Sequence, residues 1–219
     1  MAYHPLWSNE YWLLLLQLYM KKPIGIKPVY FHGLVSLALE IHIDPVFLHE
    51  QMFYLRQSGR PSIKKLWNEY GKHPKKLEQK ATLIRKEYGF SFPDKFFKNV
   101  EIKETWEKDF RPIDNKTDIT PATLIMILNL YFQLTPVTMV PETPEIEDLS
   151  HLISISVDKI IQIMDIFQYC DPYLNRHILA KIDSPLLESC QDIWNRFGNK
   201  DPRALYTLSL ELKNYFTSM

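Results

Sequence analysis

The chain has 219 residues, 46% of them hydrophobic, and its 26 Lys and Arg balance 26 Asp and Glu. These values are ordinary for a globular protein with one core or two units of roughly a hundred residues each. Six glycines leave little material for phosphate-cradling loops, and two cysteines alone cannot form a disulfide framework or a four-ligand metal site. We expect Cys170 and Cys190 to be reduced, buried thiols.

The charge is divided unevenly along the chain. Residues 1–100 carry 15 Lys and Arg against 8 Asp and Glu, a balance of +7. Residues 101–219 carry the remaining 11 against 18, a balance of −7. The sequence therefore combines a basic first half with an acidic second half.

Helix signals dominate the sequence and predict an all-α protein. Proline follows a capping residue at Thr120, Ser184 and Asp201, and Gly71 and Gly198 stand where helices should end. The first, basic unit (1–89) is expected to hold helices over 9–21, 29–42, 45–57, 61–71 and 74–88. The second, acidic unit (119–219) is expected to hold helices over 120–133, 143–153, 156–169, 184–197 and 201–217, with an insertion at 170–183.

The first expected helix carries an apolar run from Trp12 to Met20. This run is far shorter than the ~20 residues that span a bilayer. Asn9 and Glu10 precede it, in place of the basic residues that open a signal peptide. We therefore expect a soluble, cytoplasmic protein with no membrane partner.

The segment 34–56 has the apolar spacing of two helices joined by a tight turn. Leu37 and Ile41 would hold the first helix and Ile43 would fill the turn, while the second helix would be seated by Leu48, Met52 and Leu55. This pattern resembles a helix-turn-helix of the winged-helix kind. Segment 146–168 repeats it with Leu149, Ile153, Ile155, Ile160, Met164 and Phe167.

Both segments depart from a DNA-reading helix-turn-helix. His42 and Ser154 stand where the turn usually carries glycine. A DNA reader presents cations and amides to phosphates and bases. The second helices instead present Val46, Phe47, Glu50, Phe53 and Tyr54 in one segment and Asp158, Lys159, Gln162 and Asp165 in the other. We interpret both segments as structural elements.

Positive charge follows the first of these segments. Ten Lys and Arg lie between Arg56 and Lys86, against Glu69 and Glu78. The candidate surface for a polyanion or an acidic partner consists of Lys64, Lys65, Lys72, Lys75, Lys76 and Lys80. The same charges could simply solvate a helix flank. They could also dock the acidic second unit, within one chain or between chains, through Glu142, Glu145, Glu147 and Asp148.

The segment between the two units, 90–118, is rich in aromatic residues. A flexible linker would instead consist of Gly, Ser and charged residues. We therefore expect an ordered connector that packs across both units, with a short strand near 100–103.

Catalytic and metal-binding patterns are missing from the sequence. His49-Glu50 opens like a two-histidine zinc motif, but Phe53 occupies the position of the second histidine. The seven histidines are scattered, and the sequence contains no dinucleotide, Walker-type or nucleophile-elbow pattern. We expect no catalytic residue, no metal ion and no cofactor.

An internal repeat links the two units. Trp67-Asn68-Glu69-Tyr70-Gly71 returns as Trp194-Asn195-Arg196-Phe197-Gly198, and the spacing of the apolar residues upstream is kept. Such repetition indicates units that must bury their apolar faces. We expect the aromatic residues of the two copies to be core anchors: Trp67, Tyr70, Trp194 and Phe197.

The whole chain resembles an uncharacterised bacterial protein family of unknown function, and this resemblance implies no activity and no site residue. Three functions remain open. The first is a non-enzymatic interaction or scaffold protein that binds a protein partner or another copy of itself. The second is a nucleic-acid-binding protein that uses the basic surface over 56–86. The third is an enzyme or ligand-binding protein with a site between the two units.

Overall fold

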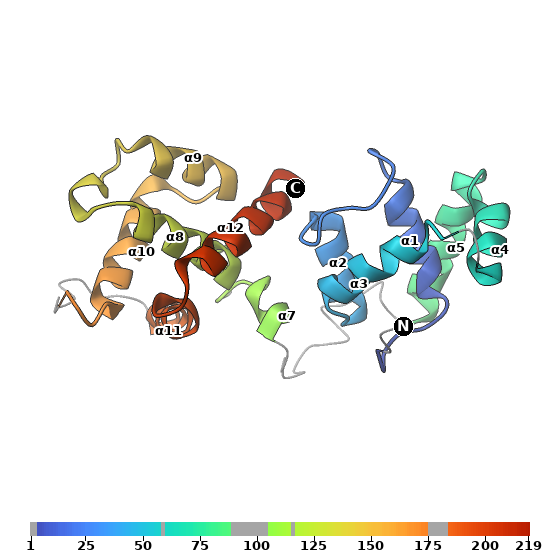
Figure 1. Ribbon diagram of the computed structural model, residues 1–219, viewed down its shortest axis with the longest axis horizontal. Coiled ribbons are helices and arrows are strands. Elements are labelled where there is room, and N and C mark those ends of the chain that lie inside the picture. Colours follow the sequence, from blue (N-terminus) through green and yellow to red (C-terminus); the bar gives the residue numbers. More distant parts are fainter. Residues whose placement is uncertain (1–3, 58–59, 89–104, 115–116, 175–183) are drawn as a thin grey trace. The chain divides into compact units, whose positions relative to one another are not determined.

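The computed structural model describes the whole chain except residues 1–3, 58–59, 89–104, 115–116 and 175–183 (Figure 1). The described residues form helices, turns and loops and contain no strand, which confirms the expected all-α class. They divide into two compact units, Met1–Lys103 with Ser218–Met219 and Glu104–Thr217.

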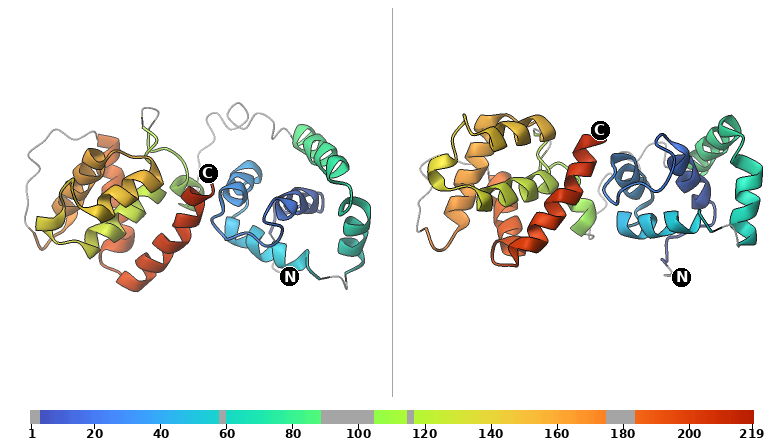
Figure 2. Two further views of the ribbon diagram at one scale, coloured as in Figure 1. Left: turned by 90° about the horizontal axis from the view of Figure 1, so that it is seen from above. Right: turned by 45° about the horizontal axis from the view of Figure 1, so that its top comes forward.

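Unit 1 is built around helix α1, Tyr11–Met20. Most of this helix is apolar and buried, as expected for a helix covered on several sides. Its neighbours are α2 (His32–Ile41), α3 (Pro45–Tyr54) and α5 (Pro74–Glu87), and α4 (Pro61–Tyr70) packs against α5. Helices α4 and α5 lie on one side of the unit and α2 on the other (Figure 2).

Unit 2 is built around helix α8, Pro121–Gln133, which is buried to a similar degree. Its neighbours are α7 (Thr105–Asp109), α9 (Pro144–Ile153), α10 (Val157–Cys170), α11 (Ser184–Ile193) and α12 (Pro202–Thr217). Two short elements complete the unit: the 3-10 turn η1 (Pro136–Thr138) and the π-helical turn η2 (Trp194–Gly198).

Most expected helix boundaries lie within three residues of the observed ones. One expected helix is divided, since 184–197 becomes α11 and the wider turn η2. Helix α7 falls inside the expected connector and packs against α8, so this part of the connector belongs to unit 2. The remainder of the connector at 90–104, including the expected strand, and residues 175–183 of the insertion lie outside the described residues.

The caps explain where several helices begin. Thr120 accepts from the Thr123 amide at 3.3 Å and its own amide donates to the Thr123 hydroxyl, so α8 begins with a capping box. Thr143 also stands directly before a proline at a helix start, but its side chain does not cap α9, because the Thr143 hydroxyl donates to the Thr138 carbonyl at 2.5 Å instead. Helix α1 also begins without a side-chain cap at Glu10, and the Ser8 hydroxyl accepts from the Glu10 amide at 3.4 Å.

Helix pairs α2–α3 and α9–α10 are joined by turns of the same conformation. His42 and Ser154 both adopt the left-handed region, with φ of 55° and 56°, and no other described non-glycine residue has a positive φ. Ile43 and Ile155, the next residues, are buried in their turns. The apolar side chains expected to seat the two pairs are buried as well. The internal repeat nevertheless stays a prediction.

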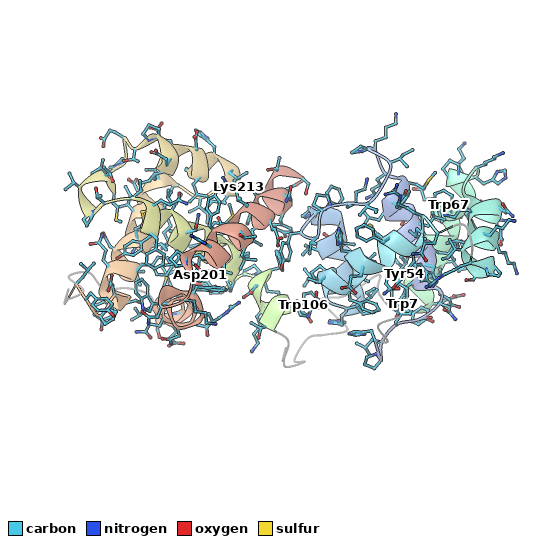
Figure 3. All side chains as sticks on the ribbon, viewed as in Figure 1. Trp7, Tyr54, Trp67, Trp106, Asp201 and Lys213 are labelled. Atoms are coloured by element: carbon cyan, nitrogen blue, oxygen red, sulfur yellow. The ribbon has the colours of Figure 1, made fainter. Side chains whose placement is uncertain are left out.

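Matching contacts surround the two tryptophans of the repeated motif. Trp67 meets Tyr19 edge-on at 5.8 Å, and Trp194 meets Tyr131 edge-on at 6.0 Å. Trp194 is buried, whereas Trp67, on α4, is half-buried (Figure 3). The Trp67 indole N–H donates to the Leu55 carbonyl at 2.7 Å. Of the other expected anchors, Tyr70 is buried and Phe197 is half-buried.

Candidate functional site

The candidate surface lies where α4 and α5 meet. Lys64, Lys65, Lys72, Lys75 and Lys76 are exposed there, and Lys80 is half-buried. Helix α4 ends at Tyr70 and α5 begins at Pro74, so the chain turns between them within three residues. This short turn concentrates the positive charge at one corner of unit 1.

A groove of about 670 Å³ occupies this corner. Its lining consists of Asn68, Glu69, Lys72, His73, Pro74, Lys75 and Lys76, and we call it the α4–α5 groove. Three of the six lysines expected at the surface line the groove, while Lys64, Lys65 and Lys80 do not. The α4–α5 groove therefore contains the central part of the candidate surface, Lys72, Lys75 and Lys76.

Two groove residues, Asn68 and His73, were not expected from the charge pattern. Asn68 belongs to the repeated motif, next to Trp67, and His73 immediately precedes Pro74. The repeated motif that contains Asn68 marks the end of α4, and the His73-Pro74 pair marks the start of α5. The groove forms because this helix end and this helix start are adjacent.

The turn itself has a defined hydrogen-bond pattern. The Gly71 amide donates to the Trp67 carbonyl at 2.8 Å, and the His73 amide donates to the Tyr70 carbonyl at 2.9 Å. The His73 carbonyl then accepts from the Leu77 amide at 3.0 Å, which starts α5. Pro74 occupies the first helical position, where a missing N–H costs nothing.

One groove lysine is held by an acidic neighbour. Lys76 Nζ lies 3.1 Å from Glu69 Oε1 and 5.1 Å from the centre of the Tyr70 ring. The Lys76 hydrogen bond lowers the pKa of the Glu69 carboxyl. Burial raises the pKa of the Tyr70 hydroxyl, and its hydrogen bond to Glu69 adds to this effect. Glu69, which lines the groove, thus interacts with both Lys76 and Tyr70.

The other two groove lysines keep their charge available. Lys72 and Lys75 are exposed, and within the described part of the chain neither forms an ion pair. An exposed, unpaired ammonium group attracts anions over roughly one Debye length, about 10 Å at 0.1 M salt. The α4–α5 groove is therefore a concave surface with two available cations and a third partly neutralised.

The second helices of the helix-turn-helix-like pairs are partly covered by neighbouring residues. On α3, the Phe47 ring is met by the rings of His4 at 5.3 Å and Trp7 at 5.6 Å. Helix α10 packs against α8, α9 and α11. A helix that reads DNA must enter the major groove with a free face. The exposed face of α3 carries Val46, Glu50 and Phe53, none of them basic, and the interpretation of both pairs as structural elements stays a prediction.

The described residues offer no obvious catalytic centre. No group of three or more His, Cys, Asp or Glu among them could hold a metal ion. His49 packs edge-on against Phe53 at 5.2 Å, which is a structural contact. Both cysteines are free; burial raises the pKa of Cys170 to about 11 and raises that of Cys190 further above its ordinary value. Neither thiol has the lowered pKa of a nucleophile.

No helix in the part of the chain that the structure describes has both the length and the apolarity to cross a membrane. Comparison with known proteins finds no match, whether the chain is set against protein-family models, curated proteins or solved structures.

Proposed function

We propose that this chain is a non-enzymatic interaction protein whose α4–α5 groove binds an acidic partner protein. The observation that carries the proposal is the pair of exposed cations, Lys72 and Lys75, on the wall of a concave surface. Like-charged groups repel, so a cluster of lysines is stabilised when an acidic surface covers it. A cytoplasmic location, expected from the sequence, belongs to the same proposal.

The composition of the groove favours an acidic protein over a nucleic acid. Glu69 lies in the groove beside the lysines and would repel a continuous line of phosphates. A protein surface can instead place an acid opposite each lysine and leave Glu69 beside a neutral group. The groove also contains no arginine, although arginine is the side chain best suited to bidentate phosphate contacts.

Nucleic-acid binding is the second candidate. Lys64 and Lys65 are exposed on α4 and extend the positive charge beyond the groove. Such a surface would contact phosphates without reading bases, because the exposed residues of α3 and α10, among them Glu50, Phe53 and Asp165, include no arginine or lysine to aim at base edges. The third hypothesis from the sequence, an enzyme or ligand-binding protein with a site between the units, draws no support from the groups described above.

The test compares two labelled probes, a poly-glutamate peptide and a random-sequence DNA duplex, by fluorescence anisotropy at ~50 mM salt. The triple variant K72E/K75E/K76E should weaken peptide binding at least tenfold. A matched control, K200E/R203E/K213E, makes the same change of charge at three exposed positions of unit 2 and should leave peptide binding intact.

Tighter binding of the duplex than of the peptide would favour the nucleic-acid candidate. Its affinity should then fall steeply with salt, since each lysine–phosphate contact releases a counterion. Equal losses in the groove variant and the control variant would contradict a role for the groove, because only net charge would then matter.

A further inference from the structure

The loop before helix α9, residues 135–143, is internally braced. The Thr135 amide donates to the Thr138 hydroxyl at 3.0 Å, and that hydroxyl donates back to the Thr135 carbonyl at 2.9 Å. The Thr143 hydroxyl then donates to the Thr138 carbonyl, and its amide donates to the Val140 carbonyl at 3.1 Å. Together with the prolines at 136 and 141, these bonds fix the loop in one shape.

A buried contact attaches the braced loop to the body of unit 2. Met139 is 9% exposed, and its sulfur accepts a hydrogen bond from the buried Gln168 side chain of α10 at 3.3 Å. Two valines near Met139 are exposed: Val137, two residues before it, is 85% exposed, and Val140, directly after it, is 41% exposed. The loop thus presents two valines to solvent on a rigid support, and a rigid element loses little entropy on binding.

Exposed acids flank the two valines. Glu142, Glu145, Glu147 and Asp148 are all exposed at the start of α9. Glu145 and Glu147 lie in the first turn, where negative charge stabilises a helix. Glu142 precedes the helix and Asp148 lies beyond its first turn, so the helix dipole does not account for them. The apolar tip and the acidic flank together form what we call the acidic loop, residues 135–148.

We propose that the acidic loop of one copy of this chain occupies the α4–α5 groove of a second copy. This inference rests on the proposed function, since it uses the same groove and names its partner. The charges are complementary: acids flank the loop, and Lys72, Lys75 and Lys76 line the groove. Val137 and Val140 would contact Pro74 and the aliphatic stems of the lysines.

The charge of the whole chain allows copies to approach one another. The formal net charge is zero, so no general repulsion separates two molecules. The contact joins two different surfaces, the groove in unit 1 and the loop in unit 2. Two copies related by a two-fold axis can each fill the other's groove, which closes the assembly as a dimer with two equal contacts.

The first test is the mass of the intact chain by light scattering, at about 100 μM protein, a concentration that detects weak pairing. At ~50 mM salt we expect twice the 26.0 kDa chain mass, and at ~500 mM salt a return to 26.0 kDa. A mass of 26.0 kDa at both salt concentrations would overturn the proposal, whether the loop is free or docks within its own chain.

Charge reversal provides the decisive test. The groove variant K72E/K75E/K76E and the loop variant E142K/E145K/E147K should each be monomeric, because like charges then face each other. When the two variants are mixed they should associate, because the acidic groove of the first variant then faces the basic loop of the second. The control K200E/R203E/K213E should pair like the wild type. A mixture that stays monomeric would reject the proposal.

A further variant tests the loop without changing the charge at the start of α9. Reversing Glu145 and Glu147 removes favourable charge from the first turn of α9 and could lower its stability. The variant Val137→Ser with Val140→Ser keeps every charge and should still weaken pairing severalfold, with thermal unfolding unchanged. Unchanged pairing in this variant would contradict a role for the loop tip.

Different results would reject pairing with a second copy and binding of an acidic partner protein. A wild-type monomer that binds poly-glutamate through the groove would keep the proposed function and reject the second copy as its partner. Pairing that survives charge reversal of the groove, together with unchanged peptide binding in that variant, would reject both.

Discussion

The indole ring of Trp67 lies so close to Gly71 that a β-carbon at Gly71 would stand 2.7 Å from the ring atom Cε3. The same β-carbon would stand 2.7 Å from the Trp67 carbonyl oxygen. Trp194 covers Gly198 in the same way, with two ring atoms at 2.7 Å. In each unit, a tryptophan folds back over the glycine four residues later, which explains why both residues occur in the repeated motif.

Replacing Gly71 by alanine should therefore destabilise unit 1. Overpacking of this kind costs about 1–3 kcal/mol. The measurement is the free energy of unfolding from urea denaturation. Gly33→Ala is the comparison variant, because the nearest atoms that a β-carbon there would meet are side-chain atoms of Leu18 and Phe31, at 2.9 Å, and none of them is a backbone atom as at Gly71. Equal stability of the two variants would show that the Trp67 ring moves aside freely.

Replacing Trp67 or Trp194 by alanine should lower the free energy of unfolding by different amounts, because the two rings are buried to different extents. Trp194→Ala should cost about 3–5 kcal/mol, since its ring is buried against three other aromatic rings. Trp67→Ala should cost less, because this ring is half-buried. Trp67→Phe isolates the hydrogen bond to the Leu55 carbonyl and should cost about 0.5–1.5 kcal/mol. Near-wild-type unfolding of Trp194→Ala would reject its role as a core anchor.

Asp109 on α7 and Arg196 in η2 form an ion pair whose coupling energy should be measurable. Arg196 donates two hydrogen bonds to Asp109, at 2.7 and 2.6 Å, and both side chains are less than one-quarter exposed. These bonds raise the pKa of the Arg196 guanidinium. A double-mutant cycle with Arg196→Met and Asp109→Asn should give a coupling energy of about 1–3 kcal/mol.

The exposed pair Lys76–Glu69 is the reference for that cycle. Its side chains are 56% and 40% exposed, so its coupling energy should fall below about 1 kcal/mol. If the two cycles give equal values, the bidentate geometry of Arg196 and Asp109 contributes nothing beyond that of an ordinary surface pair.

Alkaline pH should destabilise the fold. Burial raises the pKa of Tyr11, Tyr70 and Tyr215, and it raises that of Cys170 to about 11 from 9.0. The folded chain then keeps protons that the unfolded chain loses, so the free energy of unfolding falls as pH rises through about 9 to 10. Burial raises the pKa of Cys190 as well. Burial lowers the pKa of Lys27, which has the opposite effect, but among the described residues this one group opposes five phenols and thiols.

Urea denaturation at pH 8 and pH 10 measures this change. Tyr215→Phe should reduce the loss between the two values, because one shifted phenol is removed. Tyr206→Phe, at an exposed position, should not reduce it. A wild-type stability that rises between pH 8 and pH 10 would show that the Lys27 effect dominates.

Glycine at the turn before α10 should stabilise unit 2. Ser154 is exposed and holds a left-handed backbone that glycine adopts without steric cost. Ser154→Gly should add up to about 1 kcal/mol to the free energy of unfolding. Ser156→Gly, two residues later in extended backbone, should give no gain. A loss of stability in Ser154→Gly would mean that its side chain supports the turn.

The helices could be predicted because local chemistry specifies them. Proline at the first helical position marks the start of α5, α8 and α12, and apolar spacing marked Leu48 and Met52 as buried. Buried positions follow from helical periodicity without knowledge of the neighbouring helices. The cysteines were expected to be buried thiols, and Cys190 is buried while Cys170 is half-buried.

The features missed by the sequence analysis depend on contacts between distant residues or on competing bonds. The Thr143 hydroxyl donates to the Thr138 carbonyl and does not cap α9, and sequence alone does not show this. The wider turn η2 coincides with the close contact of Trp194 and Gly198. The groove forms where two helices meet, so its position could not be predicted from the lysines alone; Lys64 and Lys65 lie on α4 outside it, and their part in a binding surface stays a prediction.

The central position of α1 has a consequence for synthesis of the chain. Helix α1 is made before α5, one of its main neighbours, which ends only at Glu87. Until that helix leaves the ribosome, a nascent chain carries the apolar stretch Leu13–Leu16 without its full cover. Exposed apolar surface in an incomplete chain invites aggregation. Folding of unit 1 during translation should thus depend on chaperones that bind short apolar segments.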